Sequence, residues 1–319
     1  MPGKDMPLEQ LKEYKGRDLP PKDFYEFWEE AVREIKLKGP TIHKEETIFS
    51  NREAVCRRVF VTAPDGCVLS AKYIRPKGVE ASPLVIQFHD YPEAARSCFH
   101  LLRYASIGYA VLAPDCRSQG GESGTGTVGG PLFAGLGGNV KKMSLYHLIT
   151  DALLWVTAAQ TLEGIESSSI SVYGEGQGGG LALACAGMYS EIRKCGAHYP
   201  MLCDYRRVWE MDFMQRGYDG LAYYFRWQDP LHKAEEDIFH KLQYVDVKNF
   251  SAYIQAETIV STGLQDQVSP PSAQFAVVNG MNCPRKHMIY PKHGHELNNF
   301  FENEWLKFLL KGAGGNERL

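Results

Sequence analysis

The sequence contains no run of apolar residues long enough to cross a membrane. Hydrophobic residues make up 44% of its 319 residues, which is enough for a sizeable core, but no run approaches the roughly 18 residues that a transmembrane helix needs. The N-terminal residues Met1–Met6 also lack the apolar segment of a secretory signal. We therefore expect a cytoplasmic protein that has no membrane as its partner.

The sequence also lacks a large net charge and closely spaced pairs of cysteines. The formal net charge of −3 gives no reason to expect nucleic acid as a partner. The eight cysteines include no C-x-x-C pair, and several lie in apolar runs, as Cys185 does. Such cysteines are typical of reduced, buried thiols in the cytosol rather than of disulfides. No motif in the chain calls for a cofactor.

The order of predicted elements favours an α/β fold with a mostly parallel, doubly wound sheet and helices on both faces. An amphipathic helix follows Asp23, and three antiparallel strands follow that helix, with a turn at residues 64–66. From Pro83 onward, short apolar strands alternate with helices, as in a sheet that is covered on both faces. The predicted strands are Thr41–Phe49, Ala54–Ala63, Cys67–Arg75, Leu84–Phe88, Tyr109–Ala113, Ser169–Tyr173, Gly196–Tyr199, Thr258–Thr262 and His287–Tyr290.

Residues 201–250 interrupt this alternation. The segment is aromatic, charged and helix-prone, with Trp209 and Trp227 among its residues. We interpret it as a helical cap insertion over the ends of the strands. The prediction for the whole chain is a single domain over residues 1–319 that carries this cap.

A strand, a glycine cluster and an Ala/Leu helix pattern follow one another at Ser169–Ala184. This is the context of a nucleophile elbow, G-x-S-x-G, in which a serine stands on a sharp turn between strand and helix. Gly174 and Gly178 occupy the positions of the two glycines, but Gly176 stands where the serine belongs. The chain therefore has the predicted scaffold for acyl transfer without the attacking oxygen.

Three further loops fall at the carboxyl ends of predicted strands, where ligands bind in such sheets. The loop after Phe88 and the residue after the nucleophile, Gln177, are the expected sources of two backbone amides for an oxyanion hole. Asp266 and His295 follow the last two strands in the chain order nucleophile–acid–histidine. Each loop also has an ordinary interpretation as a turn or cap. A metal site formed by His293 and His295 is disfavoured, because no carboxylate lies at a spacing that would supply a further ligand.

These loops together resemble the acetyl xylan esterase and cephalosporin C deacetylase family of carbohydrate esterases, over nearly the whole chain. The family signatures R-G-Q-G, G-x-S-Q-G and H-E read here as residues 117–120, 174–178 and 295–296. The resemblance implies an α/β-hydrolase fold, a hexamer with active sites facing an inner cavity, and removal of acetyl groups from xylo-oligosaccharides or small acetyl esters. It assigns the motif positions Arg117, Gln119, Gly120, Gly174, Gly178 and Glu296, the acid Asp266, the base His295, and an oxyanion hole from the amides of Tyr91 and Gln177.

Two positions depart from the family pattern. Ser118 replaces a glycine, which affects only a local turn, and Gly176 replaces the serine, which affects the reaction itself. Without serine Oγ no acyl-enzyme can form. Three explanations stay open: a natural pseudoenzyme that binds acetylated sugars, an engineered inactive variant, or a shifted mechanism. Natural divergence is favoured, because designers usually choose alanine and because Ser118 differs as well.

A replacement nucleophile is not evident from the sequence. Ser171 and Tyr173 precede the turn, and Ser118 belongs to a different loop. Glu175 is adjacent to Gly176, but its side chain is expected to point away from the position of the missing hydroxyl. The sequence therefore leaves hydrolysis and binding as competing functions.

Overall fold

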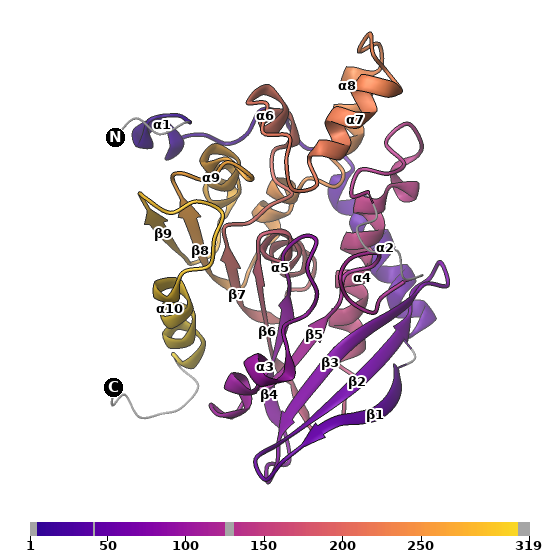
Figure 1. The fold of residues 1–319 in the computed structure, drawn as a ribbon, viewed down its shortest axis with the longest axis vertical. Helices are drawn as coiled ribbons and strands as arrows, with labels where there is room; N and C mark the ends of the chain where they lie inside the picture. Colours follow the sequence, from indigo (N-terminus) through magenta and orange to yellow (C-terminus); the bar gives the residue numbers. More distant parts are fainter. Residues whose placement is uncertain (1–4, 41, 125–130, 312–319) are drawn as a thin grey trace.

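The computed structural model describes residues 5–40, 42–124 and 131–311. Its centre is a nine-stranded sheet in the order β1-β2-β3-β5-β4-β6-β7-β8-β9, which runs diagonally across Figure 1. The strands from β5 through β4 to β9 are parallel, while β1, β2 and β3 form an antiparallel extension at one edge. This arrangement confirms the predicted fold class.

The strand bounds agree with the predicted ones to within a few residues. The largest differences are strands that begin several residues before the predicted start, because pairing with a neighbouring strand extends a strand beyond its apolar run. β6 begins at Ile165, which pairs with Ser82 of β4, and not at Ser169. The strands are β1 (Ile42–Ser50), β2 (Ala54–Thr62), β3 (Val68–Pro76), β4 (Ser82–Phe88), β5 (Ala110–Pro114), β6 (Ile165–Glu175), β7 (Ile192–His198), β8 (Glu257–Gly263) and β9 (Arg285–Tyr290).

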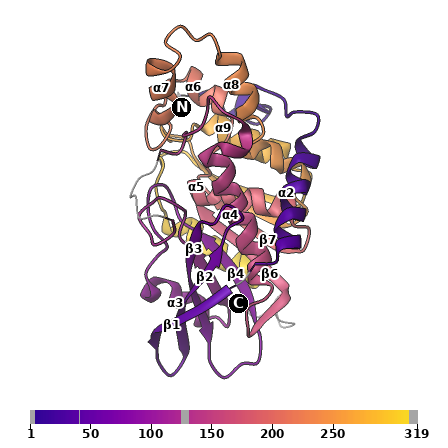
Figure 2. The same cartoon turned by 90° about the vertical axis from the view of Figure 1, so that its right-hand side faces the viewer.

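Helices cover both faces of the sheet, as Figures 1 and 2 show. One face carries α3 (Cys98–Ala105) and α10 (Asn299–Leu310), whose apolar side chains form the smaller core. The other carries α2 (Phe24–Lys38), α4 (Ser144–Ala159), α5 (Gln177–Met188) and α9 (Pro271–Gly280), which form the larger core. Short pieces complete this part of the fold: α1 (Leu8–Leu11) and the 3-10 helix η1 (Val140–Lys142).

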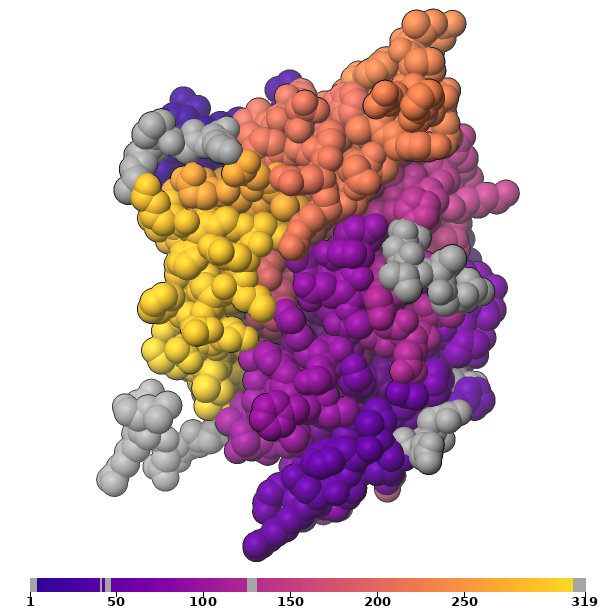
Figure 3. Space-filling model, viewed as in Figure 1, coloured from indigo at the N-terminus to yellow at the C-terminus, as the bar shows by residue number. Residues whose placement is uncertain are grey.

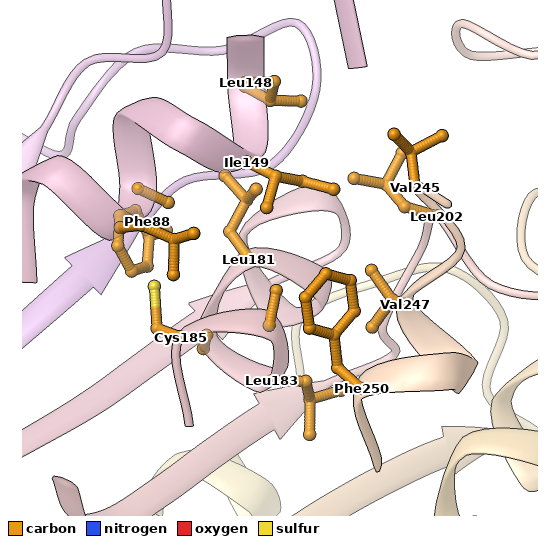
Figure 4. Packing of buried hydrophobic residues seen from close by; sticks show 14 of the residues in the cluster. Phe88, Leu148, Ile149, Leu181, Leu183, Cys185, Leu202, Val245, Val247 and Phe250 are labelled. Carbon is orange, nitrogen blue, oxygen red and sulfur yellow. The ribbon is translucent and has the colours of Figure 1, made fainter. Parts of the chain in front are cut away.

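Helix α5 follows the elbow and is buried from Gln177 to Gly187. A helix that is apolar on all sides must be surrounded by other elements. Figure 4 shows Leu181 near Ile149 of α4, Leu183 near Phe250, and Cys185 near Phe88. Because the start of this helix is enclosed by its neighbours, the elbow before it has a fixed position.

The segment 201–250 contains α6 (Tyr205–Glu210), α7 (Asp219–Trp227), α8 (Glu235–Leu242) and the start of the 3-10 helix η2 (Val247–Tyr253). Figure 3 shows the orange part of this segment projecting above the rest of the molecule. The helical insertion is therefore present, while the limits of a single domain over residues 1–319 stay a prediction. No helix in the described ranges is both long and apolar enough to span a bilayer.

Helix α2 is attached to the larger core by Trp28, and replacing this residue with alanine should destabilise the fold. Trp28 is fully buried, stacks on Tyr146 and donates from Nε1 to the carbonyl of Tyr244 at 2.7 Å. Loss of a buried tryptophan typically costs about 3–5 kcal/mol of unfolding free energy. Urea unfolding of Trp28→Ala measures this loss, and Leu37→Ala on the exposed face of the same helix should change it little.

Candidate active site

Gly176 joins β6 to α5 in a backbone conformation that suits glycine. Its φ of +52° and ψ of −117° lie outside the regions that side-chain-bearing residues adopt easily. The close approach of the flanking glycines completes the turn. A β-carbon on Gly174 would lie 2.1 Å from the backbone of Gly178, and one on Gly178 would lie 2.3 Å from the carbonyl oxygen of Phe88. The predicted elbow geometry is therefore present at this position.

The structure brings Asp266 and His295 together beside this turn. His295 Nδ1 donates to Asp266 Oδ2 at 2.8 Å, and both side chains are nearly inaccessible to solvent. The other oxygen of Asp266 accepts from the amides of Val268 and Ser269. Asp266 is therefore held rigidly, and it fixes the orientation of the imidazole ring.

The side chain of Asp90 fills the place where a nucleophile side chain would project from Gly176. A β-carbon at position 176 would lie 1.8 Å from Asp90 Oδ1 and 2.3 Å from its Cγ. Asp90 follows β4, the neighbour of β6, and its side chain is only 4% exposed. Its Oδ2 lies 3.4 Å from His295 Nε2. A carboxylate from the next loop thus takes the third position beside Asp266 and His295.

The same carboxylate occupies the two amides expected to form the oxyanion hole. Asp90 Oδ1 accepts from the backbone N–H of Tyr91 at 2.8 Å and from that of Gln177 at 3.0 Å. His89 holds the loop after β4 in place, because its Nδ1 contacts the Asp90 carbonyl and its Nε2 accepts from the backbone N–H of Cys116. Both amides therefore donate to a single oxygen, which belongs to the Asp90 side chain and not to a substrate.

Arg216 contacts this group from the helical insertion. Its Nη1 lies 3.2 Å from Asp90 Oδ2, and its side chain is 47% exposed. Sequence reasoning missed both Asp90 and Arg216. The available signal for Asp90 was a carboxylate directly at the carboxyl end of a strand next to the elbow strand. Nothing in the sequence relates Arg216 to that loop, because the contact spans 126 residues.

The charges of this cluster follow from its geometry. Burial alone would lower the pKa of His295, but the carboxylates of Asp266 and Asp90 outweigh burial and raise that pKa to about 9. Burial would raise the pKa of Asp90, but His295 and the Gln177 and Tyr91 amides outweigh it and lower that pKa. At neutral pH His295 is thus an imidazolium between carboxylates, which leaves it no free lone pair for general-base catalysis.

The first family motif lies beside the elbow and makes structural contacts. Arg117 binds the carboxylate of Asp151 with two hydrogen bonds, 2.5 and 2.6 Å long. The side-chain amide groups of Gln119 and Gln177 each donate one hydrogen bond to the other. Gly120 donates its N–H to backbone carbonyls of the loop after Asp90. These contacts attach the motif to the oxyanion loop and to the start of α5.

The remaining motif positions are peripheral. Ser118, at a position where the resemblance predicts a glycine, has a φ of +55°, so the turn has a backbone conformation that favours glycine. Glu296 Oε1 lies 3.1 Å from His293 Nδ1 and is exposed, at 56% of its side-chain surface. Among the described residues, no group of three or more His, Cys, Asp and Glu side chains is arranged to hold a metal ion.

Comparison with known proteins agrees with this architecture. A family model described as acetyl xylan esterase (AXE1) matches residues 1–312. Acetyl xylan esterase 1 from Thermoanaerobacterium sp. JW/SL YS485 is 35% identical, with a TM-score of 0.92 over 96% of this chain and 99% of that chain. The acetyl xylan esterase from Paenibacillus sp. R4 is 30% identical, with a TM-score of 0.89 over the same shares.

A curated relative covers a shorter stretch. Acetyl esterase Axe7A from Xylanibacter ruminicola is 26% identical over 168 residues, which are 52% of this chain and 36% of the relative. The match thus spans about a third of that longer protein. The sheet topology and the solved relatives together identify the fold as that of the α/β-hydrolases.

Restoring serine at the elbow should destabilise the protein. In Gly176→Ser the new side chain takes a strained backbone conformation, which costs about 1–3 kcal/mol, and it displaces the Asp90 carboxylate from its two amides. Thermal unfolding of Gly176→Ser and Asp90→Gly/Gly176→Ser separates the two effects. The double variant should regain part of the lost melting temperature. A single variant at least as stable as the parent would contradict the contact between positions 90 and 176.

The charge on His295 predicts a loss of stability in alkaline solution. Its folded pKa of about 9 exceeds the ordinary value of about 6.5. The protonated ring therefore contributes its full stabilisation below pH 6.5, and this contribution is lost as pH rises through 9. The unfolding free energy of the parent should fall relative to that of His295→Gln over this window. A constant difference from pH 6 to pH 10 would show that the ring is not held as an imidazolium.

Proposed function

This chain belongs to the acetyl xylan esterase family, and we propose that it binds the sugar ligands of that family without hydrolysing them through an acyl-enzyme. The observation that carries the proposal is the Asp90 carboxylate, which hydrogen-bonds both oxyanion amides and overlaps the position of a side chain at residue 176. A serine esterase needs that space for its nucleophile and those amides for the ester oxygen.

Three features that a serine esterase needs for ester hydrolysis are thus different in this chain. Residue 176 has no hydroxyl, the two amides already have an acceptor, and His295 carries a proton at neutral pH because its pKa is raised to about 9. Loss of a triad nucleophile alone lowers kcat by about 10⁶-fold in subtilisin. Water activated by His295 is not a substitute, since an imidazolium accepts no proton. These features favour the pseudoenzyme hypothesis over residual deacetylation.

The ligand in this proposal is a xylo-oligosaccharide held by its sugar part. An acetyl group has no free amide pair to bind, because Asp90 Oδ1 accepts from both amides. Hydroxyl groups of a sugar can instead meet the outer oxygen of Asp90 and the half-exposed guanidinium of Arg216. The hexameric assembly is part of the proposal through the family resemblance. The cytoplasmic location is proposed from the missing signal segment and the unpaired cysteines, and natural divergence at Gly176 is proposed because Ser118 differs as well.

An acetate-release assay on acetylated xylobiose tests the loss of hydrolysis. The parent and Gly176→Ser should stay at background, because in both proteins Asp90 competes for the oxyanion amides. Asp90→Gly/Gly176→Ser regains the nucleophile and both donors, and it should release acetate at least about 10³-fold faster than the parent. The matched control Asp90→Asn/Gly176→Ser keeps a side chain of the same size in the hole and should stay slow.

Calorimetry tests the binding half of the proposal. Unacetylated xylobiose should bind the parent at least as tightly as its acetylated form, and no acetate should appear during the titration. Release of acetate by the parent that is lost in His295→Ala would establish an esterase and overturn the proposal. A failure of both sugars to bind would overturn the assigned ligand.

A further inference from the structure

The two oxygens of Asp90 have different surroundings. Oδ1 accepts from two backbone amides, while Oδ2 lies between His295 Nε2 at 3.4 Å and Arg216 Nη1 at 3.2 Å. The Nε2 atom of His295 is buried and has no hydrogen-bond partner of good geometry among the described residues. A buried polar atom without a partner is uncommon in folded proteins. Oδ2 and Nε2 thus lie close together without a well-aligned hydrogen bond between them.

We propose that Asp90 is the nucleophile of a hydrolase acting on a tetrahedral carbon whose leaving group departs as a stable anion, such as a halide or a sulfate. This activity goes beyond the sugar-binding role and depends on the same position of Asp90. Carboxylates act as nucleophiles in several enzyme classes. Here the carboxylate is ionised, oriented by two amides and adjacent to a histidine–aspartate pair.

Because Asp90 Oδ1 already accepts from both amides of the oxyanion hole, the site favours alkyl substrates over acyl substrates. Attack on an ester carbonyl would build negative charge on the substrate oxygen, and Tyr91 and Gln177 already donate to Asp90 Oδ1. Displacement at a tetrahedral carbon builds no such charge. The geometry therefore favours alkyl transfer to Asp90 over acyl transfer.

In the first step, a lone pair of Asp90 Oδ2 forms a bond to the substrate carbon. The bond from that carbon to the leaving group breaks, and the anion departs with its electron pair. No proton is needed, and Asp90 becomes a neutral alkyl ester. Arg216 contacts the same oxygen at 3.2 Å, so its positive charge lies beside the reacting atoms.

Esterification of Asp90 then changes His295. The ring loses one of its two neighbouring carboxylate charges, so it releases its extra proton to solvent more readily. Neutral His295 can next take a proton from water while the water oxygen attacks Cγ of Asp90. The negative charge of the tetrahedral intermediate develops on Oδ1, where the amides of Tyr91 and Gln177 already donate.

Collapse of this intermediate completes the cycle. The bond from Cγ to the alkyl oxygen breaks, and the leaving alkoxide takes the proton from His295. The hydroxyl proton of the new carboxyl group then passes to His295, which restores the imidazolium and the Asp90 carboxylate. The product alcohol carries the former Oδ2, and the carboxylate carries one oxygen from water. The balance is one alkyl halide and one water giving one alcohol, one proton and one halide ion.

The experiment uses the full chain with 1-bromobutane as the probe. The parent should release bromide over many turnovers. His295→Gln should retain a butyl ester on Asp90, identified by mass spectrometry of the peptide, with a lifetime about 10²–10⁴-fold longer than in the parent, because the general base is lost. Asp90→Asn/His295→Gln, the matched control, should form no ester at residue 90. Peptide mapping separates this ester from alkylated cysteines.

An oxygen-18 measurement on the parent does not depend on any variant folding. After a single turnover in labelled water, the label should appear in the Asp90 peptide and be absent from the butanol. Label in the butanol, adducts on cysteines alone, or bromide release that is unchanged in Asp90→Asn would overturn the inference. Absence of bromide release together with absence of acetate release would reject this activity and leave the binding role intact. Acetate release from the parent would reject the binding role independently.

Discussion

The carboxylate of Asp90 lies where two backbone amides converge beside a glycine, and the character of the site depends on this contact. The amides come from the loop after β4 and from the start of α5, two neighbouring elements of the sheet-and-helix framework. A charge-assisted hydrogen bond to each amide holds one carboxylate oxygen in place. Because position 176 has no side chain, nothing competes with Asp90 for this space. Gly176 and Asp90 are therefore compatible with one another, whereas a side chain at position 176 would overlap the Asp90 carboxylate.

This contact also sets the electrostatics. A buried carboxylate needs compensation, and Asp90 receives it from two amides, an imidazolium and a guanidinium. In return, His295 stands between two carboxylates, which raises its pKa to about 9. In a serine triad the histidine must be neutral before it accepts a proton. Here Asp266 and His295 form a hydrogen-bonded pair of the same type, but the protonated ring fits a carboxylate partner rather than a hydroxyl.

Much of the fold followed from local pattern. Leu84–Phe88 reads as a covered strand and lies in the centre of the sheet, because a continuous apolar run is stable only where both faces are buried. The elbow, Asp266 and His295 were also predicted to lie at one edge, because each follows the carboxyl end of a parallel strand of the same sheet. Strand limits were less accurate at Ile165, since pairing with Ser82 depends on a neighbour and not on local composition.

The sequence by itself determined the parallel sheet, the turn that carries glycine in place of serine, and the family, because each is encoded in a short spacing or an apolar period. It also predicted Asp266 and His295 as the acid and the histidine. Only the tertiary structure decided that a carboxylate from another loop replaces the missing side chain. That substitution depends on where Asp90, Gly176 and Arg216 meet in space, and they come from β4, β6 and the helical insertion. A contact between side chains so far apart in the chain leaves no periodic signal, since it arises from the packing of whole elements.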